Sequence, residues 1–75
     1  MSTDRARALV AKALNLPDVA ATDGIGNLPA WDSLGHMHVI LALEAELGGQ
    51  LDAGDIAGLL TVADVSKILS QDAAE

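Results

Sequence analysis

The sequence of 75 residues contains no cysteine, no phenylalanine and no tyrosine, and Trp31 is its only aromatic residue. The lack of cysteine excludes a disulfide framework and a metal site built from thiolates. Because aromatic rings are nearly absent, the core must consist of Leu, Ile, Val, Ala and Met, and such a core suits helices better than a sheet. The composition therefore predicts an all-α protein.

Basic residues are also scarce, because four Lys and Arg stand against eleven Asp and Glu and give a net charge of −7. This balance argues against binding to nucleic acid or to anionic membrane surfaces, and it favours partners with basic docking patches. No apolar stretch is long enough to span a membrane, and the N-terminus lacks the apolar run of a signal peptide. We expect a monomeric cytoplasmic protein with one domain, residues 1–75, and no membrane insertion.

The spacing of apolar and helix-breaking residues predicts four helices. The first three span about residues 4–14, 33–47 and 53–59, and the fourth begins at Thr61 and frays from Ser70 onward. We therefore expect a small four-helix bundle with three main helices and a short third helix. A long loop separates the first two helices, and its expected anchors are Val19, Ile25, Leu28 and Trp31.

The second predicted helix is apolar on two sides. At about 100° per residue, one broad stripe is formed by His36, Val39, Ile40, Leu43 and Leu47. A second stripe, separate from the centre of the first, consists of Leu34, Met37 and Leu41. The first stripe is sufficient to pack the helix. From the pattern alone we expect the second to be further core, and the alternative is an exposed binding strip beside Ser33.

Ser33 is expected at the N-terminus of this helix, directly after the long loop. Unpaired backbone N–H groups and the positive end of the helix dipole favour an anion such as a phosphate there. Serine also occurs at helix starts simply as a cap. Because Asp32 can cap the helix by itself, the Ser33 hydroxyl remains free for another role.

The residues give little support for catalysis or metal binding. His36 and His38 lie two apart on a helix, point in different directions and have no cysteine beside them, so we expect no metal site. His36 follows Ser33 by three residues, but no carboxylate is evident that would orient it as a base. An esterase-like enzyme is therefore the least favoured alternative, and we expect a protein that is not an enzyme.

The segment Asp32-Ser33-Leu34, at the start of a helix after a long loop, resembles the phosphopantetheine attachment motif of acyl carrier proteins and related carrier domains. Residues 41–47 (LALEAEL) look like the end of the family's second helix, and residues 61–65 (TVADV) look like the start of its last helix. The resemblance covers nearly the whole chain. It implies a bundle of acyl-carrier-protein type in which a phosphopantetheinyl transferase links 4'-phosphopantetheine from coenzyme A to Ser33, with Asp32 as part of the motif.

The resemblance also implies a role and partners. The terminal thiol of the arm would carry acyl or aminoacyl groups as thioesters between a loading ligase or transferase and downstream biosynthetic enzymes. In the family, the surface that corresponds to Leu34, Met37, Leu41 and Glu44 contacts such partners.

The chain departs from carriers of primary fatty acid synthesis, which usually have acids soon after the serine, where this sequence has Gly35 and His38. We therefore expect a stand-alone carrier of a specialised pathway, and we expect Gly35→Asp with His38→Glu to improve docking to primary fatty-acid enzymes. An aminoacyl or peptidyl carrier is the alternative within the family. A helical interaction module that is never modified is the alternative outside it.

Overall fold

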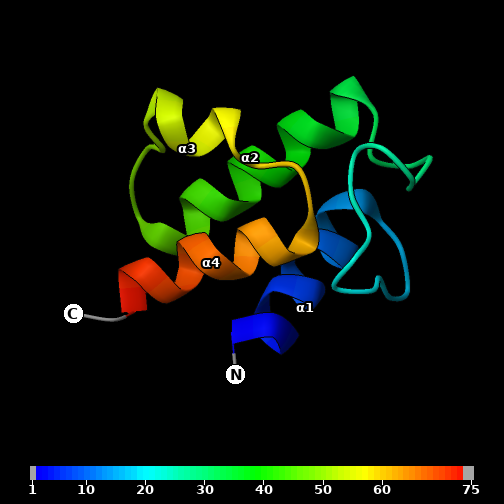
Figure 1. The fold of residues 1–75 in the computed structure, drawn as a ribbon, viewed down its shortest axis with the longest axis horizontal. Coiled ribbons are helices and arrows are strands. Elements are labelled where there is room, and N and C mark those ends of the chain that lie inside the picture. Colours follow the sequence, from blue (N-terminus) through cyan, green and yellow to red (C-terminus); the bar gives the residue numbers. More distant parts are fainter. Residues whose placement is uncertain (1, 74–75) are drawn as a thin grey trace.

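The computed structural model describes residues 2–73, and within that range it contains four α-helices and no strand. The helices are α1 (Ser2–Leu14), α2 (Ser33–Leu47), α3 (Ala53–Ala57) and α4 (Val62–Ala73). The predicted all-α fold is thus confirmed. α1 packs against both α2 and α4, and the short α3 lies in the connection from α2 to α4 (Figure 1). No helix of the described part is long and apolar enough to cross a membrane.

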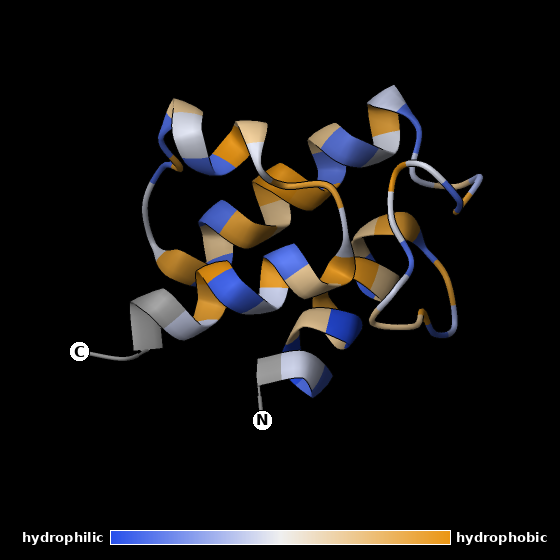
Figure 2. Cartoon of the chain, in the orientation of Figure 1, coloured by the Kyte–Doolittle hydropathy of each residue, from blue (hydrophilic) through white to orange (hydrophobic). Residues whose placement is uncertain are grey.

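The core is almost entirely aliphatic, as the composition predicts, and Trp31 is its one large ring. Hydrophobic positions recur along all the long helices (Figure 2). The first apolar stripe of α2 faces inward, because Val39 and Leu43 are fully buried. Among the described side chains, the buried hydrophobic residues of the core are Ala6, Val10, Ala11, Val19, Trp31, Val39, Leu43, Leu59, Val62, Val65, Ile68 and Leu69.

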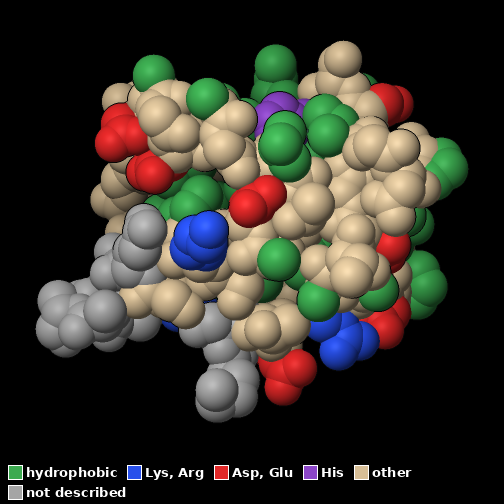
Figure 3. Space-filling model, in the orientation of Figure 1, with side chains coloured by type: hydrophobic (Ala, Val, Ile, Leu, Met, Phe, Trp, Pro, Cys, Tyr) green, Lys and Arg blue, Asp and Glu red, His purple; other side chains and the backbone are tan. Residues whose placement is uncertain are grey.

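Several large hydrophobic side chains nevertheless remain on the surface. In Figure 3, green side chains gather beside a histidine at the upper edge of the molecule. The most exposed large hydrophobic residues are Ile25, Leu34, Met37, Leu41 and Leu60. The expectation that the second stripe of α2 is further core is therefore wrong, since all three of its members are in this set.

The helix ends follow local backbone chemistry. α2 has the predicted bounds, because Asp32 caps its start and Gly48, with φ of 77°, ends it in the left-handed conformation. α3 ends two residues earlier than predicted: the Gly58 N–H makes its last α-helical bond, to the Gly54 carbonyl, and the Leu59 N–H bonds instead to the Ile56 carbonyl three residues before it. α4 continues past Ser70 to Ala73, the fraying expected from Ser70 onward stays a prediction, and the last two residues lie outside the described range.

Side-chain caps begin both α3 and α4. The Asp52 carboxylate accepts a hydrogen bond from the Asp55 N–H at 2.8 Å, as expected for an N-cap. Before α4, the Asp64 carboxylate accepts from the Thr61 N–H at 2.9 Å while the Thr61 hydroxyl accepts from the Asp64 N–H at 3.2 Å. This reciprocal pair is a capping box with Asp in place of Glu.

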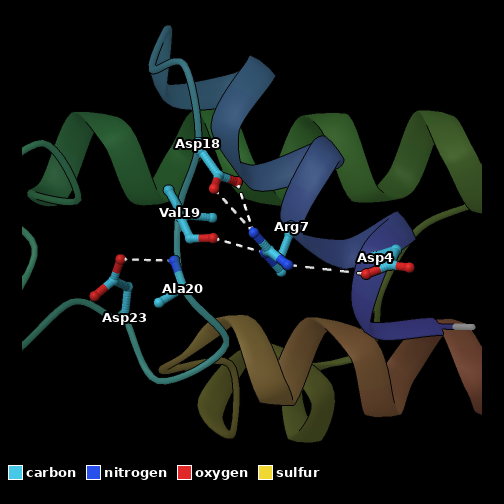
Figure 4. A network of polar contacts seen from close by, with 6 residues as sticks. All are labelled: Asp4, Arg7, Asp18, Val19, Ala20 and Asp23. Carbon is cyan, nitrogen blue, oxygen red and sulfur yellow. Dashed lines mark hydrogen bonds and ion pairs between the residues drawn. The ribbon is translucent and has the colours of Figure 1, made fainter.

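Arg7 of α1 fastens the first part of the long loop. Its Nε donates to the Val19 carbonyl at 2.8 Å, and its Nη2 donates to the Asp18 carboxylate at 2.9 Å (Figure 4). Further along, the Asp23 carboxylate accepts from the Ala20 N–H at 2.9 Å. These bonds satisfy polar backbone groups that a long loop would otherwise leave to water, so this segment is held in a defined path.

The middle of the long loop is hydrogen-bonded to the backbone at the start of α4. The Ile25 N–H donates to the Leu60 carbonyl at 2.9 Å, and the Val62 N–H donates to the Asp23 carbonyl at 2.9 Å. A Cβ on Gly24 would lie 2.4 Å from the Leu60 oxygen, so glycine permits this close approach. Ile25 is thus held by its backbone and not by burial of its side chain, contrary to the prediction.

The other three predicted anchors of the loop are confirmed. Val19 and Trp31 are buried in the core, and Leu28 is half-buried against it. The loop therefore delivers the chain to the start of α2 along a path fixed at both ends.

Candidate functional site

Ser33 is the first residue of α2, and its side chain is exposed. The Oδ1 atom of Asp32 accepts a hydrogen bond from the Gly35 N–H at 2.9 Å, and the Asp32 carbonyl accepts from the His36 N–H at 2.7 Å. Within residues 2–73 the Ser33 hydroxyl makes no hydrogen bond. Asp32 thus performs the capping, as predicted, and the serine hydroxyl is not needed to hold the helix end.

Trp31 and His36 hold the loop against the first turn of α2. The indole N–H of Trp31 donates to Nδ1 of His36 at 2.9 Å, and the two rings stack with centroids 6.2 Å apart. Trp31 is 1% exposed, so this bond satisfies a buried donor that water cannot reach. The lone pair on Nδ1 is occupied, and that nitrogen is therefore not available as a base for Ser33.

Gly35 lets the loop and α1 approach the helix start closely. A Cβ at this position would lie 2.4 Å from the Ala30 carbonyl oxygen and 2.9 Å from a methyl group of Leu14. The Gly35→Asp exchange considered from the sequence therefore cannot be made without displacing the loop or α1. Glycine is required here by packing, and an acidic side chain has no space.

The second stripe of α2 forms an exposed apolar strip beside Ser33. Leu34, Met37 and Leu41 are 63%, 56% and 57% exposed. Their spacing places them along one side of the helix, starting directly after the serine. We call these three residues the α2 strip. A contiguous row of large apolar side chains next to a free hydroxyl is typical of a surface that contacts another molecule.

The acidic residues at the far end of α2 already have structural partners. The Oε2 atom of Glu44 accepts from the Leu51 N–H at 3.0 Å and so holds the segment between α2 and α3. Glu46 forms an ion pair with Arg5 of α1. The contact of Glu44 with partner proteins stays a prediction, and any such contact has to use the carboxylate oxygen that does not bind Leu51.

A shallow hollow of about 250 Å³ lies in the loop just before Ser33. Among the described residues, no three His, Cys, Asp or Glu side chains are grouped so that they could hold a metal ion. The residues that line the hollow are Ile25, Gly26, Asn27, Leu28, Pro29, Trp31 and Asp32.

Sequence reasoning placed Ser33 and the Asp32 cap at the start of α2, but it expected the α2 strip to be core and missed the roles of Gly35 and His36. No pattern in the local sequence indicates that Gly35 lies against the Ala30 carbonyl. The position of His36 within the buried stripe was a signal that its ring packs inward, but not that Trp31 is its partner.

Chemically, the site offers one primary hydroxyl that is open to solvent, next to free backbone N–H groups at the positive end of a helix. It can accept a phosphoryl or acyl group from an external donor, and the N–H groups favour an anion at that place. No protein-family model, curated protein or solved structure matches the chain. The function therefore has to be inferred from the residues of the site themselves.

Proposed function

We propose that this chain is a carrier protein of acyl-carrier-protein type, with 4'-phosphopantetheine attached to Ser33. The observation that carries the proposal is the exposed Ser33 hydroxyl, which makes no hydrogen bond to the described residues, at a helix start that Asp32 caps. The resemblance of Asp32-Ser33-Leu34 to the attachment motif of these carriers supports the same residue. The arm supplies a terminal thiol on which an acyl or aminoacyl group is carried as a thioester.

The electrostatics of the helix start favour such a modification. In the transfer from coenzyme A, the Ser33 oxygen gains a bond to phosphorus, the nucleotide part of coenzyme A leaves, and the transferase takes the serine proton. The resulting phosphodiester carries a negative charge next to the N–H groups of Ser33 and Leu34, which no residue of the helix can satisfy. Because the chain has no cysteine, a carrier thiol has to come from an attached group.

The arrangement of helices supports the proposal too. α1, α2 and α4 pack together, and a short α3 leads from α2 to α4. This order agrees with the bundle that the resemblance implies, with the modified residue at an open corner.

The α2 strip is the surface that we assign to partner enzymes, namely the phosphopantetheinyl transferase, a loading ligase or transferase and downstream biosynthetic enzymes. Met37, with its flexible thioether, adapts to several partner surfaces. Glu44 lies one turn beyond Leu41 and adds charge at the edge of the strip. Because Gly35 leaves no space for an acid and His38 provides none, docking beside Ser33 relies on apolar contact.

Such apolar docking favours a stand-alone carrier of a specialised pathway over a carrier of primary fatty acid synthesis. An aminoacyl or peptidyl carrier would use the same site. The alternative within this proposal is therefore that the carried group is aminoacyl or peptidyl instead of acyl. We do not propose an esterase, because Nδ1 of His36 accepts a hydrogen bond from the Trp31 indole and, within the described residues, no carboxylate orients the ring as a base. The rival from another class is a helical interaction module that uses the α2 strip and is never modified.

The test is incubation of the purified chain with coenzyme A, Mg²⁺ and a promiscuous phosphopantetheinyl transferase, followed by intact mass spectrometry. The proposal predicts a gain of one phosphopantetheinyl group that requires the transferase. An unmodified interaction module predicts an unchanged mass.

A further inference from the structure

A groove of about 610 Å³ runs between α1 and α2. The two helices are antiparallel, because Arg5 near the start of α1 contacts Glu46 near the end of α2, while Leu14 lies beside Gly35. The volume is within the usual range of small-molecule sites. The lining consists mostly of small and aliphatic side chains: Arg5, Ala8, Leu9, Lys12, Ala13, Ala42, Ala45 and Glu46.

The charged residues of the groove are placed at its two ends. The ion pair of Arg5 with Glu46 joins α1 to α2 and closes one end. Lys12 lies seven residues further along α1, which is about 10 Å in a helix, and its side chain is exposed. Within the described residues Lys12 has no ion-pair partner. The aliphatic stems of both basic residues extend the apolar lining.

We propose that this groove binds a single-chain alkyl carboxylate without a covalent bond. The alkyl chain covers the alanine-lined floor between the helices, and the carboxylate pairs with the ammonium group of Lys12. Lys12 supplies one uncompensated positive charge, which matches a headgroup with one negative charge. The chain as a whole is strongly acidic, with a net charge of −7, so an anion is repelled from most other surfaces.

The closed end of the groove favours a small ligand over a helix of a partner protein. A helix laid along the groove would collide with the Arg5 and Glu46 side chains that bridge it, whereas a short alkyl chain ends before them. The groove uses residues of α2 other than Leu34, Met37 and Leu41. The inference therefore does not depend on modification of Ser33 or on docking to the α2 strip.

The first experiment titrates the unmodified chain with decanoate below its micelle concentration and follows backbone amide shifts by NMR. We expect saturable shifts at Ala8, Ala13, Ala42 and Ala45. Decanol, which has the same chain without the charge, should bind more weakly. Shifts centred on Leu34 and Met37 instead, or equal affinity for the two ligands, would overturn the proposal.

Two pairs of variants test separately the charge of Lys12 and the space within the groove. Lys12→Gln should weaken decanoate binding by roughly two- to fivefold, as expected for a partly exposed ion pair, and should leave decanol binding unchanged. Lys67→Gln on α4 makes the same change in net charge and should bind decanoate like the parent chain. An equal loss in both variants would show that only net charge matters and would contradict the assignment.

Ala45→Leu fills the groove and should abolish the shifts at Ala42, while Ala63→Leu on an exposed position of α4 should retain them. Circular dichroism establishes that both leucine variants are folded. Undiminished binding by the Ala45→Leu variant would exclude the groove as the site.

Discussion

The indole N–H of Trp31 donates a 2.9 Å hydrogen bond to Nδ1 of His36, across the turn that contains Asp32 and Ser33. Through this bond the end of the long loop is fixed to the first turn of α2. Together with the Asp32 cap, it determines where the Ser33 hydroxyl lies without using that hydroxyl. The exposed Ser33 side chain thus lies at a corner that is held by hydrogen bonds in which the serine hydroxyl takes no part.

His36→Ala should lower the free energy of unfolding by about 1–3 kcal/mol, because it leaves the buried indole N–H of Trp31 without a partner. His38 is exposed and makes no side-chain hydrogen bond within the described chain, so His38→Ala should stay within about 0.5 kcal/mol of the parent. Urea unfolding followed by circular dichroism measures both values. Equal stability of the two variants would contradict the role given to His36.

Gly35→Ala should destabilise the chain by about 1–3 kcal/mol, although alanine is favoured over glycine within helices by up to about 1 kcal/mol. The reason is the 2.4 Å approach of the new Cβ to the Ala30 carbonyl oxygen. Gly26→Ala is the matched control, since nothing lies within 4 Å of a Cβ there. A Gly35→Ala variant more stable than the parent in thermal melts would show that the loop does not approach this closely.

Arg7→Met should release the first part of the long loop. The variant keeps an aliphatic stem but loses the bonds to the Val19 carbonyl and the Asp18 carboxylate, at a cost of about 1–2 kcal/mol for a partly exposed group. Amide hydrogen exchange should speed up at Ala20 and Asp23 more than at residues of α4. Lys67→Met is the control for loss of a basic residue. Unchanged exchange at Ala20 would refute the role of Arg7.

Met37→Glu tests the α2 strip. Because Met37 is 56% exposed, we expect thermal stability close to that of the parent chain, together with at least roughly a fivefold loss in kcat/KM for the phosphopantetheinyl transferase. Ala63→Glu places the same charge on an exposed position of α4 and should react normally. If both variants react equally fast, the transferase does not dock on this strip.

The sequence was sufficient to predict the features that depend on local chemistry. The bounds of α2 and its cap at Asp32 were predictable, because the cap involves residues only a few positions apart. Such bonds depend on the backbone of one segment, so spacing along the chain reveals them.

The features that the sequence did not predict arise from contacts between distant segments. Two apolar stripes on one helix look alike in the pattern, and only the packing of α1 and α4 decides that Val39 is covered while Leu41 is not. The need for glycine at position 35 arises from the Ala30 carbonyl, which a loop brings into place. The reach of Arg7 to Val19 depends likewise on the course of the loop.

The central claim is that Ser33 alone receives the phosphopantetheinyl group, and intact mass spectrometry of two serine variants tests it most directly. Ser33→Ala should remain folded, because Asp32 still caps α2, and it should gain no mass with coenzyme A and the transferase. Ser66→Ala, on α4, should gain one phosphopantetheinyl group like the parent chain. A folded Ser33→Ala variant that still gains this group, or a parent chain that never does, would contradict the account.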